Sequence, residues 1–263
     1  MNDPHVERLH YKLRSESTLS FESPPPINRE TPAFRIHLEE GKLTVHMFEH
    51  YADEEGAQQR VGPYLCAWEI DANLRLGRRT VWFEFERSEL IDRNPPPPAG
   101  PQTITPKALS VHWRVMPPTI HVGYRSYPPP PSRFLASPDV QTMWFRYNMW
   151  VDGREPLLSM AYACLTLLEG STGATTGSRA AVCTMYSIDP AVRKTLGDMV
   201  SERGGPDEAR KLGRSATKTP LTRKERQWVD DVIKALIRRK AEYDADPTSP
   251  LPLIAMTDFL SLP

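Results

Sequence analysis

"FRIHLEEGKLTVHMF" (residues 34–48) is the stretch that decides the fold, because apolar and polar residues alternate along it with the period of a β-strand. A two-residue turn at Glu40-Gly41 would fold the stretch back on itself. The resulting register sets Glu39 opposite Lys42 and apolar residues opposite one another. We therefore predict an antiparallel hairpin with three apolar cross-strand pairs: Phe34 with Met47, Ile36 with Val45, and Leu38 with Leu43.

The sequence around this hairpin predicts an antiparallel α+β domain over residues 31–135, preceded by an N-terminal arm over residues 1–30. Apolar residues take helical spacing over residues 53–76, where Asp53 can cap and Gly62-Pro63 would kink or split the helix. Strand-like segments follow, and we predict strands in "RTVWFEFERSEL" (79–90), "TITPKALSVHWRVM" (103–116) and "TIHVGYRSY" (119–127).

The second half predicts a helical bundle of about four helices over residues 136–246. Ser137 with Pro138 opens the first helix, and the second covers about residues 154–169. Asp189-Pro190 starts a third, and a Thr222–Glu225 capping box starts the last long one. The apolar, proline-containing tail over residues 247–263 is predicted to lie over the body as an extended strap. The fold class predicted for the whole chain is α+β.

The composition is that of an ordinary soluble protein, and we predict a cytoplasmic location and no membrane association. The chain has 263 residues, with 33 basic and 33 acidic side chains, so its total charge favours neither nucleic acid nor a membrane surface. Leu157–Leu168, the longest apolar run, is too short to span a bilayer. The cysteines, an odd set of three far apart in the sequence, indicate reduced thiols. Twenty-seven prolines, mostly clustered, predict stiff loops, with docking to a partner as the alternative.

The glycine-rich segment that follows the helix at 154–169 is a candidate ligand loop. Three residues lie between Gly173 and Gly177, where a phosphate loop has four, and Ser178-Arg179 stands where a phosphate loop has lysine and serine or threonine. A helix rather than a strand precedes the segment. A connection between helices is the favoured interpretation, and Ser178 and Arg179 are kept as ligand-binding candidates.

Histidines and carboxylates of the first half could form a metal-dependent hydrolytic site. His37 and His46 are diagonal neighbours across the predicted hairpin, and Glu84 and Glu86 share a strand face. Solvent-exposed or hydrogen-bonded side chains are the favoured interpretation of all four. A dyad of Cys164 or Cys183 with His112 or His121 also stays open. We predict no catalytic residue, no metal site and no cofactor.

A basic segment over residues 203–240 could bind nucleic acid. It holds twelve basic and five acidic residues, and such an excess can neutralise phosphates. The competing interpretation is that this segment pairs with the acidic first half. The candidates for nucleic-acid contact are Arg210, Lys211, Arg214, Arg238 and Arg239.

The helical half resembles the bundles of HEPN-type proteins in bacterial defence systems. The resemblance rests on "REPLLSMAYACLTLLEG", "WVDDVIKALIRRKAEYDAD" and "LIAMTDFLSLP". HEPN nucleases carry an arginine followed by a histidine, and no histidine follows His121 here, so the resemblance implies an inactive bundle used for binding or dimerisation. Residues 63–98 also resemble bacterial proteins, a likeness that implies no activity. The predicted function is that of a non-catalytic interaction protein that self-associates through its helical half, with a homo-oligomer, a protein partner or nucleic acid as partners.

Overall fold

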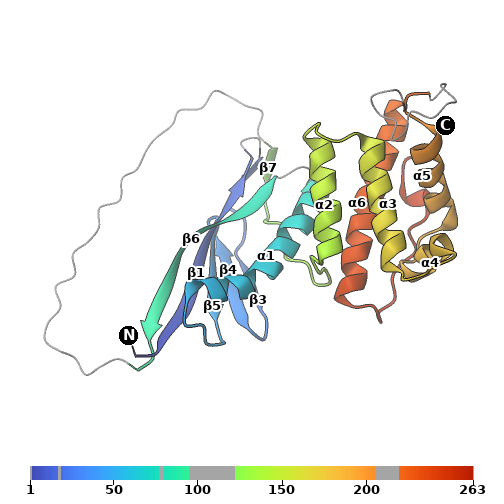
Figure 1. Cartoon of the computed structure of the whole chain (residues 1–263). Helices are drawn as coiled ribbons and strands as arrows, with labels where there is room; N and C mark the ends of the chain where they lie inside the picture. Colours follow the sequence, from blue (N-terminus) through green and yellow to red (C-terminus); the bar gives the residue numbers. More distant parts are fainter. Residues whose placement is uncertain (1, 17–18, 77–79, 95–121, 205–218, 263) are drawn as a thin grey trace, which may run out of the picture. The chain divides into compact units, whose positions relative to one another are not determined.

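The computed structural model describes residues 2–16, 19–76, 80–94, 122–204 and 219–262. The chain divides into two compact units (Figure 1). The sheet unit holds Met1–Leu65 and Arg79–Pro129, and the helical unit holds Cys66–Arg78 and Pro130–Pro263. An antiparallel sheet in the first and helices in the second confirm the predicted α+β fold class. The predicted domain limits themselves stay a prediction.

The sheet unit is built on five antiparallel strands in the order β3-β4-β5-β1-β6. The hairpin of β4 and β5 has the predicted register, with Glu39 opposite Lys42 and all three apolar pairs in place. Gly41 has a φ of +73° in its turn, a conformation that suits glycine. The strands are β1 (Pro4–Ser15), β3 (Ile27–Glu30), β4 (Phe34–Glu39), β5 (Lys42–Met47) and β6 (Val81–Asp92).

The predicted N-terminal arm is wrong, because residues 1–30 contribute strands. Strand β1 lies between β5 and β6 and pairs with both. Its register against β6 shifts between Val6 and Arg8 and again between His10 and Tyr11. Such an irregularity changes the two-residue spacing of the inward positions, and the fully buried Val6 and Leu9 are three positions apart. The apolar alternation that would have marked a strand is therefore interrupted in the sequence.

The other predicted strands have different outcomes. The stretch at 79–90 forms β6, as predicted. The described part of the stretch at 119–127 contains β7 (Val122–Tyr124), which pairs in parallel with β2 (Leu19–Phe21) in a separate two-stranded sheet. Its predicted place in the antiparallel sheet is therefore wrong. The stretch at 103–116 lies outside the described residues.

Helix α1 (Glu54–Leu76) begins where predicted, because the Gly56 N–H donates to the Asp53 carboxylate over 2.8 Å. Pro63 lies inside this one helix, so of the two predicted outcomes the split is wrong, whereas the kink stays a prediction. Burial continues on both sides of the proline. Before it Val61 is fully buried in the sheet unit, and after it Ile70 and Leu74 belong to the core of the helical unit.

The helical unit contains α2 (Pro138–Val151), α3 (Leu157–Ser171), α4 (Ser178–Met185), α5 (Pro190–Glu202) and α6 (Arg223–Ala245). Helix α3 is central, since it contacts the other four (Figure 1). The three predicted helix starts are confirmed: Ser137 and Asp189 cap α2 and α5, and Thr222 forms its capping box with Glu225. Helix α4 was not predicted, because only Val182 of its eight residues is buried and no apolar stripe marks it.

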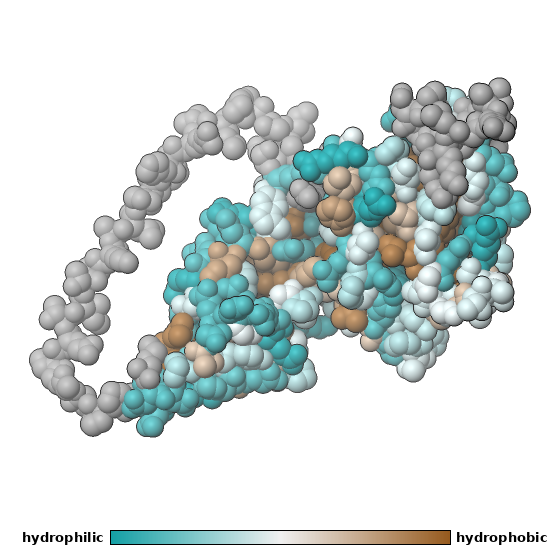
Figure 2. Space-filling view, in the orientation of Figure 1, coloured by the Kyte–Doolittle hydropathy of each residue, from teal (hydrophilic) through white to brown (hydrophobic). Residues whose placement is uncertain are grey.

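The core of the helical unit is apolar and continuous. Helices α5 and α6 contribute buried apolar side chains to it, among them Leu196, Trp228 and Val232. Apolar residues reach the visible surface of this unit in small patches separated by polar ones (Figure 2). The described tail has a turn at residues 247–248 and a 3₁₀ turn at Met256–Asp258, and its Ile254 is buried beside Ile188. Among the described residues, no helix has the length and apolarity that crossing a membrane requires.

Candidate functional site

The turn between α2 and α3 brings a basic and an acidic side chain together. Helix α2 ends at Val151, and Gly153 takes a φ of +71°, a left-handed conformation that reverses the chain. The N–H groups of Arg154 and Glu155 then donate to the Met149 carbonyl over 2.8 and 3.1 Å. This turn returns the chain to α2 and places Glu155 beside Arg146, one oxygen of Glu155 lying 3.0 Å from the Arg146 guanidinium.

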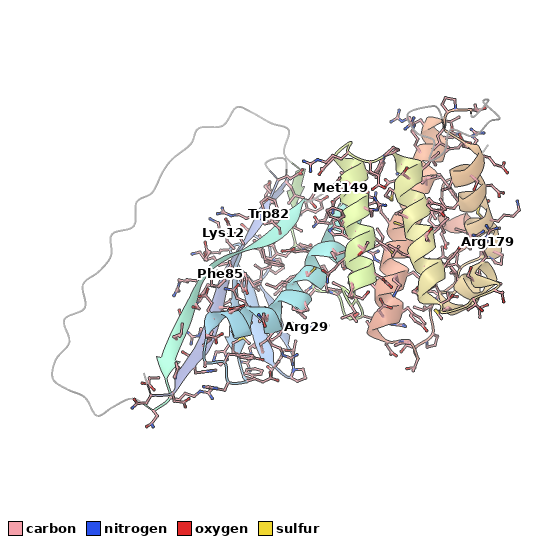
Figure 3. All side chains as sticks on the ribbon, in the orientation of Figure 1. Lys12, Arg29, Trp82, Phe85, Met149 and Arg179 are labelled. Carbon is pink, nitrogen blue, oxygen red and sulfur yellow. The ribbon has the colours of Figure 1, made fainter. Side chains whose placement is uncertain are left out.

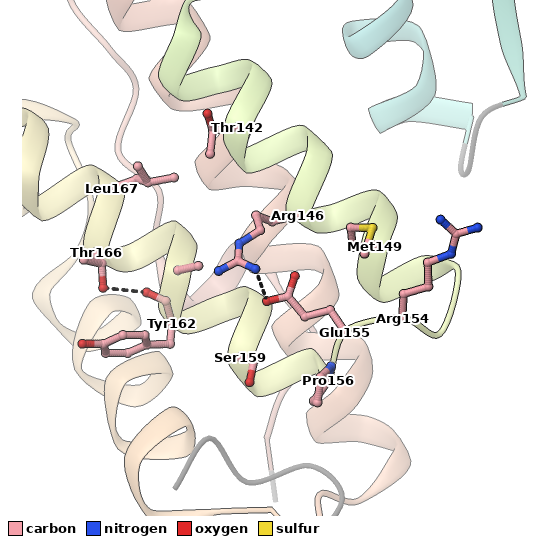
Figure 4. Close-up of a pocket in the computed structure, with 11 residues that line it drawn as sticks. Thr142, Arg146, Met149, Arg154, Glu155, Pro156, Ser159, Tyr162, Thr166 and Leu167 are labelled. Atoms are coloured by element: carbon pink, nitrogen blue, oxygen red, sulfur yellow. Dashed lines mark hydrogen bonds and ion pairs between the residues drawn. The ribbon is translucent and has the colours of Figure 1, made fainter.

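An open groove of about 700 Å³ lies along α2 and α3 around this ion pair (Figure 4). One wall comes from α2 and the other from α3, and the turn between them closes one end. Apolar and hydroxyl-bearing side chains alternate with the charged ones, a composition that is typical of small-ligand sites. Besides the ion pair, the residues that line the groove include Met149, Arg154, Pro156, Ser159, Ala163 and Leu167.

The Glu155 carboxylate is the unusual group of this groove. Its side chain is only 9% exposed, whereas Arg146 is 44% exposed. Oε1 pairs with Arg146, but Oε2 is buried and has no hydrogen-bond partner among the described residues. A buried acceptor without a donor typically costs about 1–3 kcal/mol of folding free energy. Oε2 of Glu155 therefore makes no hydrogen bond to the described residues that would stabilise the folded protein.

The electrostatics of Glu155 agree with this geometry. Burial raises the pKa of the Glu155 carboxyl, and the nearby Arg146 charge offsets only part of that effect. An acid whose pKa rises in the folded state is less well solvated as an anion than it is in the unfolded chain. A hydrogen-bond donor that enters the groove and reaches Oε2 would supply what the protein lacks.

The cysteines of the helical unit have the properties of structural thiols. Burial raises the pKa of Cys164 to about 12, and burial also raises the pKa of Cys183. A thiol rather than the nucleophilic thiolate is therefore present at neutral pH. His112 and His121, the proposed partners of a dyad, lie outside the described residues, so that hypothesis stays a prediction.

The predicted ligand loop lies elsewhere. Ser178 and Arg179 form the first residues of α4 rather than a loop, and the Arg179 side chain is exposed. In Figure 3, Arg179 and Met149 lie on opposite sides of the helical unit. The two candidates are therefore not part of the α2–α3 groove, and ligand binding by them stays a prediction.

The predicted nucleic-acid residues are only partly described. Arg210, Lys211 and Arg214 lie outside the described residues. Arg238 pairs with the buried Asp71 over 3.1 Å. Arg239 is 5% exposed and donates to the carbonyls of Tyr186 and Ser187 over 2.6 and 3.0 Å, so its guanidinium holds the backbone between α4 and α5. Nucleic-acid binding stays a prediction. Arg239 has a structural role inside the helical unit.

The structure does not gather the candidate metal ligands of the sheet unit. His37 contacts Asn28 and Glu39, and His46 lies 3.9 Å from Glu7. Glu84 pairs with Arg14. Throughout the described part of the chain, no group of three or more histidine, cysteine, aspartate or glutamate side chains could hold a metal ion.

Sequence reasoning did not single out Arg146 or Glu155. The two residues are nine positions apart, and only the turn between α2 and α3 makes them neighbours. The one available signal was a glutamate directly before Pro156, at the start of an apolar helix. Comparisons with protein families, with curated proteins and with solved structures find no match to this chain, so none of them supports the HEPN resemblance.

Proposed function

We propose that this chain is a non-catalytic binding protein that holds a small ligand in the α2–α3 groove of its helical unit. The observation that carries the proposal is the half-paired, nine-tenths buried carboxylate of Glu155 inside an open groove of about 700 Å³. Binding sites keep such groups because a ligand completes their hydrogen bonds, which gives the site specificity.

The groove chemistry favours binding over catalysis. Among the described residues that line it, Glu155 is the one carboxylate, and no lining residue is a histidine or a cysteine. The hydroxyl of Ser159 therefore has no neighbouring imidazole to activate it as a nucleophile. The buried thiol of Cys164 is kept protonated.

A groove-filling variant tests this proposal. Ala163 lines the groove from α3, so Ala163→Trp would occupy the space, whereas Ala180→Trp adds the same side chain at an exposed position of α4. Saturation-transfer NMR with a panel of amino acids, sugars, nucleotides and carboxylates measures binding to each protein. We expect one class to bind the wild type and Ala180→Trp but not Ala163→Trp. Binding that Ala163→Trp leaves unchanged, or no binding by any class, would contradict the proposal.

Self-association through the helical unit is a second candidate. Phe145 on α2 is 60% exposed, the most exposed large apolar side chain among the described residues. It is four residues before Met149, so it stands on the helix face beside the groove. A second copy covering Phe145 would remove this apolar surface from water. Sedimentation of wild type and Phe145→Glu tests the candidate, and a wild-type monomer at all concentrations would remove it.

A further inference from the structure

The Arg146–Glu155 pair presents two opposite charges side by side at the groove. Nη1 of Arg146 and Oε1 of Glu155 are 3.0 Å apart. The close-up shows both groups between the two helices, with the carboxylate reaching toward α2 (Figure 4). Their mutual contact uses one atom of each group and leaves further donors on the guanidinium and a whole oxygen on the carboxylate. A ligand with the reverse arrangement of charges can therefore contact both groups at once.

The free oxygen of Glu155 selects a donor, and an ammonium group is the strongest one. Oε2 is closed to water in the free protein, so no solvent molecule replaces the missing partner, and a small rotation of the carboxylate is needed to open this oxygen to a ligand in the groove. Burial raises the pKa of this carboxyl, which shows that the anion is poorly solvated before a ligand arrives. A hydrogen bond between two ionised groups is about twice as strong as one between neutral groups.

The guanidinium of Arg146 selects an anionic neighbour for that ammonium group. Arg146 is 44% exposed, and within the described residues its guanidinium forms an ion pair with Glu155 alone. Its planar group carries five N–H donors, which suit the two oxygens of a carboxylate. Arg154, which also lines the groove, gives the site one positive charge in excess and so disfavours a ligand that carries only an amine.

The remaining walls suit an apolar side chain. Met149, Pro156 and Leu167 line the groove around the ion pair. Apolar area that these residues bury against a ligand adds affinity without a directional contact. Ammonium, carboxylate and apolar side chain occur together, with both charged groups attached to one carbon atom, in an apolar α-amino acid.

We propose that the α2–α3 groove binds a free apolar α-amino acid, whose ammonium group donates to Oε2 of Glu155 and whose carboxylate accepts from Arg146. The proposal rests on the proposed function of the groove and names its ligand class. Binding completes the hydrogen bonds of a carboxylate that the fold leaves half-paired.

Three related probes test the charge pairing on the unmodified protein. L-leucine carries both charges, 3-methylbutylamine lacks the carboxylate, and N-acetyl-L-leucine lacks the ammonium group. Calorimetric titration of the full chain measures all three. We expect saturable binding of L-leucine, and affinities at least about tenfold lower for each of the other two, since each loses one charge-assisted contact.

Two variants localise the contact. Glu155→Gln keeps the shape of the side chain but removes the negative charge and the second acceptor oxygen, and we expect it to bind L-leucine at least about tenfold less tightly. Glu202→Gln makes the same change at an exposed position of α5 and should leave binding unchanged. Thermal unfolding followed by circular dichroism checks that both variants are folded.

The proposal is overturned if either truncated probe binds as tightly as L-leucine, or if L-leucine does not bind at all. It is also overturned if a folded Glu155→Gln keeps full affinity. These results are distinguishable from failure of the proposed function. If another class of the NMR panel binds and Ala163→Trp abolishes that binding, the groove is a ligand site and only the amino acid assignment is wrong.

Discussion

The starts of α3 and α6 offer two nearly identical carboxylates with opposite electrostatics. Glu155 and Glu225 have side chains that are 9% and 10% exposed, and each pairs with one arginine. Glu225 also accepts a hydrogen bond from the Thr222 N–H over 2.7 Å, and these contacts lower its pKa despite burial. Glu155 has no such backbone donor, and burial raises its pKa. One carboxylate therefore stabilises the fold, while the other keeps an oxygen that no donor contacts within the described residues.

Removing Glu225 tests the stabilising half of this comparison and has the largest expected effect. Glu225→Ala deletes the capping box and leaves Arg203 without its partner. We expect the free energy of unfolding to fall by about 2 kcal/mol, measured by urea denaturation. Asp198→Ala, which breaks an exposed pair with Lys194, is the control and should cause no resolvable change. An equal effect of both substitutions would show that the buried contacts of Glu225 stabilise the fold no more than an exposed ion pair does.

The pH dependence of the free energy of unfolding has opposite signs for the two carboxylates. The expected change is smaller than that caused by Glu225→Ala. The lowered pKa of Glu225 means that its contribution is fully present above the ordinary glutamate pKa and is lost as the pH falls through the folded-state value. The deficit of Glu225→Ala should therefore shrink in acid. The raised pKa of Glu155 acts in the other direction, because its contribution is fully present in acid and is lost as the pH rises through the folded-state value.

Urea denaturation at about pH 7 and about pH 3 measures both trends, since these values bracket the glutamate range. Glu155→Gln should gain stability relative to the wild type at the higher pH and lose that gain at the lower one. A Glu155→Gln variant that loses stability relative to the wild type only at neutral pH would reverse the assigned sign.

Replacing Glu155 has the smallest expected effect on stability. Glu155→Gln loses an ion pair with a half-exposed arginine but also removes a poorly solvated charge. The two effects oppose each other, so we expect the gain in free energy of unfolding at neutral pH to stay within about 0.5 kcal/mol of the wild type. A loss as large as that of Glu225→Ala would show that Glu155 is structural, and the comparison would no longer hold.

The same pair of residues shows which features could be predicted from the sequence. Thr222 and Glu225 are three positions apart on one helix turn, so local pattern was enough to predict their contact. The hairpin register was equally local, because a two-residue turn fixes every pair. Arg146 and Glu155 meet only through a reversal between two helices, which no local pattern determines.

Two elements, β1 and α4, were not predicted from the sequence, and in both cases the cause lies in the local residue pattern. Strand β1 escaped prediction because its register shifts at Val6 and His10 interrupt the alternation of apolar residues. Helix α4 escaped because its cap is Gly177, with no side-chain hydrogen bond, and because Val182 is its single buried residue. In both cases the sequence lacked the periodicity on which the other predictions depended.

Helix α1 has a consequence for any attempt to divide this chain. Its residues up to Leu65 belong to one unit, and those from Cys66 belong to the other, where Ala67, Ile70 and Leu74 join the apolar core. A fragment expressed from Pro130 onward would lack all three and would expose the neighbours that they cover. On the ribosome, likewise, the helical unit must recruit a segment translated long before its own helices have emerged.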